Sequence, residues 1–156
     1  MRGFSLLITA VLVTAPGWAA DIDKPDDKPY PIFTPANFTT NMQLMGRNFG
    51  GVNASLAKKD YEAAKGQLVR SRELLMITIT FWRNNHKDDA IKILRDTVSK
   101  MDALDDALSA DNVDQAAALA IAKGIGDGCQ SCHTLYREQD PETKAFRVKK
   151  GLLQQQ

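Results

Sequence analysis

The sequence predicts an all-α protein, a bundle of four helices that run up and down, antiparallel to one another. Two observations lead to this fold class. Proline is absent between residues 36 and 139 of the 156-residue chain, whereas it interrupts the sequence on both sides of that region. Within the same region, apolar residues recur every three or four positions in four successive segments, which is the spacing of one helix face. Short connections between these segments favour antiparallel neighbours in a single domain, residues 35–139.

The first two helices are marked by the residues that cap them. Thr34 supplies a hydroxyl before a proline at the first helical position, so the first helix is expected over residues 35–58. Asp60 caps the second helix, which is expected to continue to Trp82. Segment 74–82, LLMITITFW, would by itself also suit a buried strand, but helical spacing leads into it without a turn signal. The inward face of the first helix consists of Phe38, Met42, Met45, Phe49, Val52 and Leu56.

A polar break at residues 83–87 separates the second helix from the third. The third helix, residues 91–108, has the most regular apolar spacing in the chain. Asp111 is the expected cap of the fourth helix, with Asp114 in its first turn, where a carboxylate interacts favourably with the positive end of the helix dipole. The apolar positions that carry this helix toward the cysteines are Val113, Ala117, Ala120, Ile121, Gly124 and Ile125.

Both ends of the chain are expected to lie outside the helical domain. Arg2, a short apolar run and a small-residue exit at Ala19 have the layout of a secretory signal peptide, residues 1–19. Residues 20–34 alternate prolines with acidic residues, which predicts an extended leader. Residues 140–156 form a basic tail that is expected to be loose. Three apolar residues of this tail could still dock on the domain: Phe146, Leu152 and Leu153.

Net charge and cysteine content exclude several classes of protein. The formal net charge is +1, from 20 Lys and Arg against 19 Asp and Glu, which argues against nucleic acid as the main partner. Two cysteines cannot form a disulfide-dense scaffold. No segment after the signal peptide is long enough for a transmembrane helix. We therefore expect an exported protein, located in the periplasm and independent of the membrane once its signal is removed.

The chemically informative residues are concentrated in one motif, Cys129-Gln-Ser-Cys132-His133. Cys-x-x-Cys-His is the attachment signature of c-type haem. Residues three apart lie on one face of a helix, so both thiols can add to the two vinyl groups of a single porphyrin. The adjacent His133 then supplies the axial imidazole that haem iron ordinarily takes. Three glycines in the five positions before the motif indicate a close backbone approach, since glycine is a poor helix former. The predicted bundle therefore carries one covalent haem c, with its iron, near its C-terminus.

Other uses of the two cysteines fit the sequence less well. A thioredoxin-like dithiol normally lies near a βαβ pattern, which this chain lacks. A disulfide between Cys129 and Cys132 would close too short a loop to constrain the unfolded chain. A zinc site would need His86 as its fourth ligand, although His86 lies in a polar turn typical of the surface. No catalytic triad, carboxylate pair or phosphate-binding loop is evident, so we do not expect an enzyme.

From Ala36 to Gln139 the chain resembles the class II cytochromes c, which contain cytochrome c′ and its low-spin, methionine-ligated relatives. The most specific match is Cys129-x-x-Cys132-His133-x-x-Tyr136-Arg137. The resemblance implies that the two cysteines carry the thioethers, that His133 is the fifth iron ligand, and that Arg137 lies near the haem edge. The segment Met42-Gln-Leu-Met45-Gly46 is similar to the place where low-spin members carry a methionine ligand four residues before a glycine.

The sixth iron ligand decides which function the resemblance implies. Met42 as ligand gives six-coordinate iron, a raised reduction potential and single-electron transfer to or from a periplasmic redox partner protein. Met45, one turn away on the same face, is the competing ligand, and both methionines could instead be core residues. If neither binds iron, the implied protein is a five-coordinate, gas-binding cytochrome c′-like protein. A thiol-disulfide oxidoreductase is the third alternative, and a homodimer is compatible with each.

Overall fold

The structure, a computed structural model, describes residues 34–153. The predicted signal peptide and all but the last residue of the predicted leader lie outside the described residues. The described chain is mostly helical, which confirms the all-α class. Its elements are α1 (Pro35–Ala57), α2 (Tyr61–Met76), α3 (Ile79–Asn84), α4 (Asp88–Leu108), α5 (Gln115–Tyr136), β1 (Arg137–Gln139) and β2 (Phe146–Val148).

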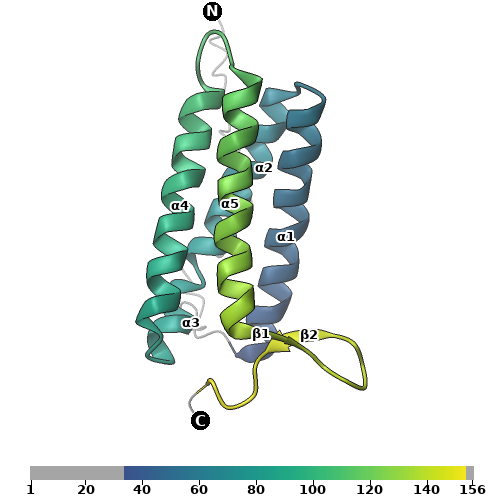
Figure 1. The fold of residues 1–156 in the computed structure, drawn as a ribbon, viewed down its shortest axis with the longest axis vertical. Helices are drawn as coiled ribbons and strands as arrows, with labels where there is room; N and C mark the ends of the chain where they lie inside the picture. The colour runs from purple at the N-terminus through teal and green to yellow at the C-terminus, as the bar shows by residue number, and fades with distance from the viewer. Residues whose placement is uncertain (1–33, 154–156) are drawn as a thin grey trace, which may run out of the picture.

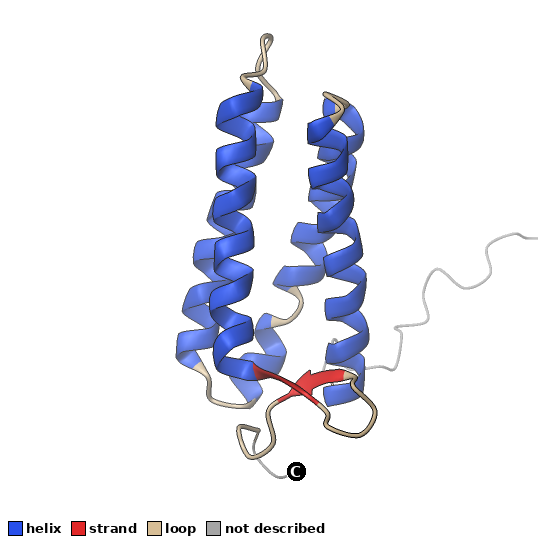
Figure 2. Cartoon of the chain, turned by 45° about the vertical axis from the view of Figure 1, so that its right-hand side comes forward, coloured by secondary structure: helices blue, strands red, loops and turns tan. Residues whose placement is uncertain are grey.

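The four long helices lie lengthwise beside one another (Figure 1). The main packing pairs are α1 with α2 and α4 with α5, and α2 also contacts α4. Short α3 and the two strands lie at the end of the molecule where α1 begins and α5 ends (Figure 2). Across residues 34–153, no helix is both long and apolar enough to span a membrane.

Two of the three predicted helix caps are confirmed. Thr34 Oγ1 accepts a hydrogen bond from the Asn37 amide at 3.2 Å, and Asp60 Oδ1 accepts one from the Ala63 amide at 3.1 Å. The predicted cap of the last long helix, Asp111, is wrong. The chain continues through a turn to Asp114, whose Oδ1 accepts from the amides of the second and third helical residues at 2.9 and 3.1 Å. Both aspartates suit a cap by residue type, but only Asp114 lies next to the free amides.

Segment 74–82 is helical, as predicted, but it is interrupted between α2 and α3. The Thr78 hydroxyl donates to the Leu75 carbonyl at 2.6 Å, and the Thr78 amide bonds the same carbonyl at 3.1 Å. Such a side-chain bond competes with the helix ladder. The neighbouring Leu74 carbonyl accepts from Asn41 Nδ2 of α1 at 2.7 Å. Asn41 is only 6% exposed, so this bond satisfies two buried polar groups and attaches α1 to the interruption.

The hydrophobic core follows the predicted stripes in the first three helices, and in the fourth it differs from the prediction at two alanines. The inward positions predicted for the first helix are buried or packed against the core, and so are those with helical apolar spacing in the next two predicted helices: Tyr61, Ala64, Leu68, Leu75, Ile79 and Trp82, then Ile91, Leu94, Val98, Met101, Leu104 and Leu108. The predicted α5 positions Ala117 and Ala120 are exposed instead. Alanine occupies both faces at the start of α5, so the sequence gives little apolar contrast there. The predicted positions Ile121 and Ile125 do face the core, and the other inward positions of α5 are Ala118, Ala122, Cys129, Cys132 and Tyr136.

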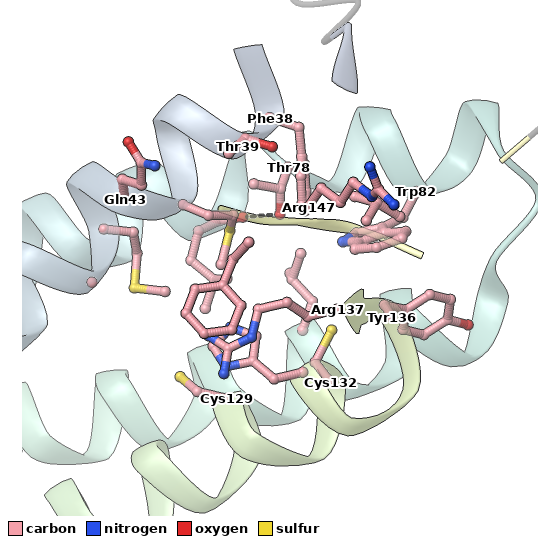
Figure 3. Close-up of a pocket in the computed structure, with 18 of the residues that line it drawn as sticks. Phe38, Thr39, Gln43, Thr78, Trp82, Cys129, Cys132, Tyr136, Arg137 and Arg147 are labelled. Atoms are coloured by element: carbon pink, nitrogen blue, oxygen red, sulfur yellow. Dashed lines mark hydrogen bonds between the residues drawn. The ribbon is translucent and has the colours of Figure 1, made fainter. Parts of the chain in front are cut away.

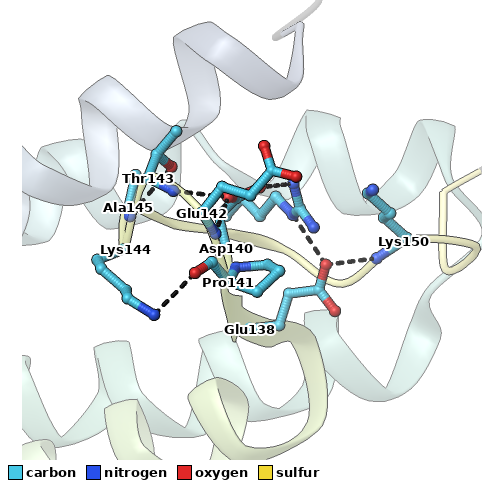
Figure 4. Close-up of polar contacts among 9 residues, drawn as sticks. Glu138, Asp140, Pro141, Glu142, Thr143, Lys144, Ala145 and Lys150 are labelled. Carbon is cyan, nitrogen blue, oxygen red and sulfur yellow. Dashed lines mark hydrogen bonds and ion pairs between the residues drawn. The ribbon is translucent and has the colours of Figure 1, made fainter.

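The tail that was expected to be loose contains an ordered hairpin. Strands β1 and β2 pair antiparallel, with Arg137 opposite Val148 and Gln139 opposite Phe146. Arg147 lies between two carboxylates, with Nε 2.8 Å from Glu138 Oε1 and Nη1 paired with Asp140 (Figure 4). After the hairpin, two tail residues pack against the core, as the sequence allowed: Leu152 and Leu153.

Candidate functional site

A cavity of about 420 Å³ lies at the end of the molecule where the hairpin is found. Its lining comes from all five helices and from the hairpin (Figure 3). The volume falls within the range of roughly 300–1,000 Å³ that is typical of cofactor and small-molecule pockets. Most of its walls are apolar, including residues of the first four helices: Phe38, Met42, Met45, Leu75, Trp82 and Leu94.

The structure brings all the predicted site residues to this one cavity. Cys129, Cys132, His133 and Arg137 line it from α5 and β1, and Met42 lines it from α1. Figure 3 shows the two cysteine sulfur atoms on the side of α5 that faces the cavity. The competing methionine, Met45, also lines the cavity, whereas His86 does not. Residues separated by about ninety positions in sequence therefore meet at one site.

The close approach of α5 to α4 fixes the position of the cysteines. A Cβ atom at Gly128 would collide with the Thr97 hydroxyl of α4, which itself donates to the Ile93 carbonyl at 2.8 Å. Only glycine therefore allows this contact one residue before Cys129. The other two glycines of the run do not share the constraint, because Gly126 has open space at its Cα and Gly124 has ordinary contact distances.

Burial keeps the two thiols protonated. Desolvation raises the pKa of Cys132 to about 11, and it also raises the pKa of Cys129. The nearby Cys129 and Asp89 groups add to the rise in the pKa of Cys132. Burial, followed by the charge of Arg137, lowers the pKa of His133. A neutral imidazole has a free ring nitrogen, which is the form that binds metals.

The charged residues of the cavity are all cations. Arg137, Lys144 and Arg147 line it, and none of the described lining residues is Asp or Glu. Arg137 was predictable from the motif, whereas Lys144 and Arg147 carry no sequence signal, since both reach the cavity only through the pairing of β2 with β1. The arrangement suits a large apolar group that carries acidic substituents at one edge.

Aromatic residues connect the cavity to the start of α4. The Tyr136 and Trp82 rings are 4.7 Å apart, and the Trp82 and Phe38 rings are 5.0 Å apart. The Tyr136 hydroxyl donates to Asp89 Oδ1 at 2.5 Å. This bond lowers the pKa of Asp89, while burial and then Asp89 itself raise the pKa of Tyr136. The end of α5 is thereby attached to the first turn of α4.

We expect Tyr136→Phe to lower the free energy of unfolding at pH 7 by about 1 kcal/mol, the usual contribution of one hydrogen bond. The pKa of Asp89 is lowered in the folded state, so the bond stabilises the protein above the ordinary pKa of an aspartate. That contribution is lost as the pH falls through the lowered pKa. Denaturant unfolding at pH 7 and near pH 2 should therefore show the difference between wild type and variant shrinking in acid. Tyr61→Phe is the matched control, and a difference independent of pH would contradict the expectation.

Comparisons with family models, with curated proteins and with solved structures find no match for this chain. In the described part of the chain, no group of three or more His, Cys, Asp or Glu side chains is arranged to hold a metal ion.

Proposed function

We propose that the chain is an exported c-type cytochrome, an up-and-down four-helix bundle with one covalent haem, that transfers single electrons through iron bound by His133 and Met42. One observation carries the proposal: Cys129, Cys132, His133 and Met42 line the same apolar cavity. A haem iron takes four ligands from the porphyrin, so one or two protein side chains complete its coordination. The cationic residues at the edge of the cavity suit the two carboxylate groups of haem.

Each part of the motif would hold the cofactor in a defined way. The S–H group of each cysteine would add across one vinyl C=C bond, so that sulfur bonds one carbon and the thiol hydrogen passes to the other. This addition balances without an oxidant or a leaving group. The neutral His133 imidazole would bind iron, and the bound haem supplies reversible one-electron chemistry. The apolar walls of the cavity would limit the access of water to the cofactor and so tune its reduction potential.

Burial of the two methionines supports Met42 over Met45 as the sixth ligand. Met45 is 3% exposed and belongs to the core, whereas Met42 is half-buried and packs at the margin of the core. A side chain at the margin can turn its sulfur toward a ligand at lower cost than one packed on all sides. The five-coordinate, gas-binding alternative requires that neither sulfur binds iron. A thiol-disulfide oxidoreductase is disfavoured, because it needs a low thiol pKa and burial has the opposite effect here.

The proposal also covers location and partners. With the predicted signal peptide removed, the protein would act in the periplasm as an electron carrier and exchange electrons with a redox protein there. It would not be an enzyme in its own right, and a homodimer would be compatible with this role.

Covalent attachment is the direct test of the proposal. The full chain should be produced with its signal in a bacterial host that carries c-type maturation machinery. We expect a mature protein that begins at Ala20, with a mass increased by one haem that acidic acetone does not extract. His86→Ala is the matched control and should retain the haem, because His86 does not line the cavity. Mature protein with both thiols free would contradict the proposal.

A further inference from the structure

We infer that the C-terminal hairpin completes the cofactor site, with Lys144 and Arg137 binding the carboxylate side chains of the haem. This inference rests on the proposed function and deepens it. Lys144 lies in the loop that joins β1 to β2, and both cations line the cavity together with Cys129 and Cys132. The hairpin thus contributes the polar edge of a site whose other walls come from the helices.

The three cations at this edge differ in whether acidic side chains of the protein pair with them. Arg147 is neutralised by Glu138 and Asp140, which hold its guanidinium on both sides. Neither Arg137 nor Lys144 forms an ion pair within residues 34–153. Two positive charges at the edge of an apolar cavity thus lack a counter-charge from the described protein, which favours a ligand that brings carboxylates.

The side-chain contacts of these two cations leave donors available. The Arg137 guanidinium carbon lies 4.4 Å from the centre of the Phe146 ring, a contact that uses the face of the group and none of its N–H donors. Lys144 Nζ donates to the Pro141 carbonyl at 2.7 Å. An ammonium has three donors, so this bond to a neutral acceptor leaves two. Both cations can therefore form charge-assisted hydrogen bonds to a carboxylate.

The loop holds Lys144 in a conformation that lysine rarely adopts. Its φ is 60°, in the left-handed region, where the Cβ atom of an ordinary residue crowds the backbone. The Lys144 amide donates to the Asp140 carbonyl at 3.0 Å, and Gln139 Nε2 donates to the Lys144 carbonyl at 2.9 Å. Asp140 Oδ1 accepts from the Thr143 and Glu142 amides, and these bonds hold the pKa of Asp140 low (Figure 4). The loop therefore positions Lys144 before any ligand binds.

The test uses matured, haem-bearing protein and the midpoint potential as its readout. A positive charge near the haem disfavours the ferric state, so Lys144→Gln should lower the potential. At a fixed applied potential the ferric-to-ferrous ratio should rise roughly fivefold, as expected for one partly screened charge. Lys150→Gln is the matched control, because it removes the same charge from the same segment without lining the cavity. Lys144→Arg keeps the positive charge, so its midpoint potential should equal that of the wild type. The propionate bending bands in resonance Raman spectra should change only in Lys144→Gln.

The outcomes separate this inference from the proposed function. Wild-type protein without covalent haem would overturn both. Haem-bearing protein in which Lys144→Gln and Lys150→Gln shift the potential equally, with unchanged propionate bands, would overturn the inference alone. A larger shift of the potential in Lys144→Gln than in Lys150→Gln, together with a wild-type potential in Lys144→Arg, would support the assignment of Lys144 to the haem carboxylates.

Discussion

Replacing both cysteines, Cys129→Ala together with Cys132→Ala, is expected to abolish covalent haem and to lower the melting temperature of matured protein by at least about 10 °C. The cavity of about 420 Å³ lies among core residues of all five helices. A protein interior packs densely, and walls without a partner lose their contacts. A group that binds only the folded state stabilises that state, and a covalent group cannot dissociate from it. The variant should therefore melt far lower, or without a cooperative transition, in thermal unfolding followed by circular dichroism.

The control for this experiment separates haem from the packing of the thiols themselves. Wild type and double variant should both be produced without maturation machinery, so that neither carries haem. Their melting curves should then nearly coincide, because each substitution removes only a half-buried sulfur. Matured wild type and matured double variant with the same melting temperature would show that the helices pack fully without a cofactor.

Local patterns were sufficient to predict much of the fold. Thr34 and Asp60 were identified as caps from residue type and position, and the apolar spacing of α1 and α4 matches their buried faces. The interruption between α2 and α3 could not be found in this way. The Asn41 bond to the Leu74 carbonyl at this break joins residues 33 positions apart, and no local pattern shows it. An almost wholly apolar segment also carries no periodic signal that would mark a break.

The candidate site, like the fold, was predictable only where neighbouring residues in the sequence form a recognisable pattern. The thiols and His133 fall within five consecutive residues, so a motif is enough to place them together. Lys144 reaches the cavity only because β2 pairs with β1, and strands of three residues are too short to show an alternating pattern. The sequence does not distinguish the buried Ala118 and Ala122 of α5 from the exposed Ala117 and Ala120, because alanine is small enough to occupy either face of a helix.

The state of the iron in a Met42→Leu variant should decide between electron transfer and gas binding. Met42 lines the cavity from α1, across from the helix that carries His133. A thioether that binds iron makes it low-spin and excludes weak ligands. Met42→Leu keeps an apolar side chain of similar volume, so the protein should still fold and attach haem. We expect its iron to become high-spin and to bind carbon monoxide rapidly, as measured by absorption spectra of the ferric and ferrous protein.

Met45→Leu is the matched control, since Met45 lies one turn away on the same helix and lines the same cavity. Met45 is 3% exposed, and an apolar replacement of nearly equal volume should preserve its packing. The iron of this variant should stay low-spin and resist carbon monoxide. If Met45→Leu becomes high-spin and Met42→Leu does not, the ligand lies one turn further along α1. If the wild type is already high-spin and open to carbon monoxide, neither sulfur binds iron, and the gas-binding function replaces electron transfer.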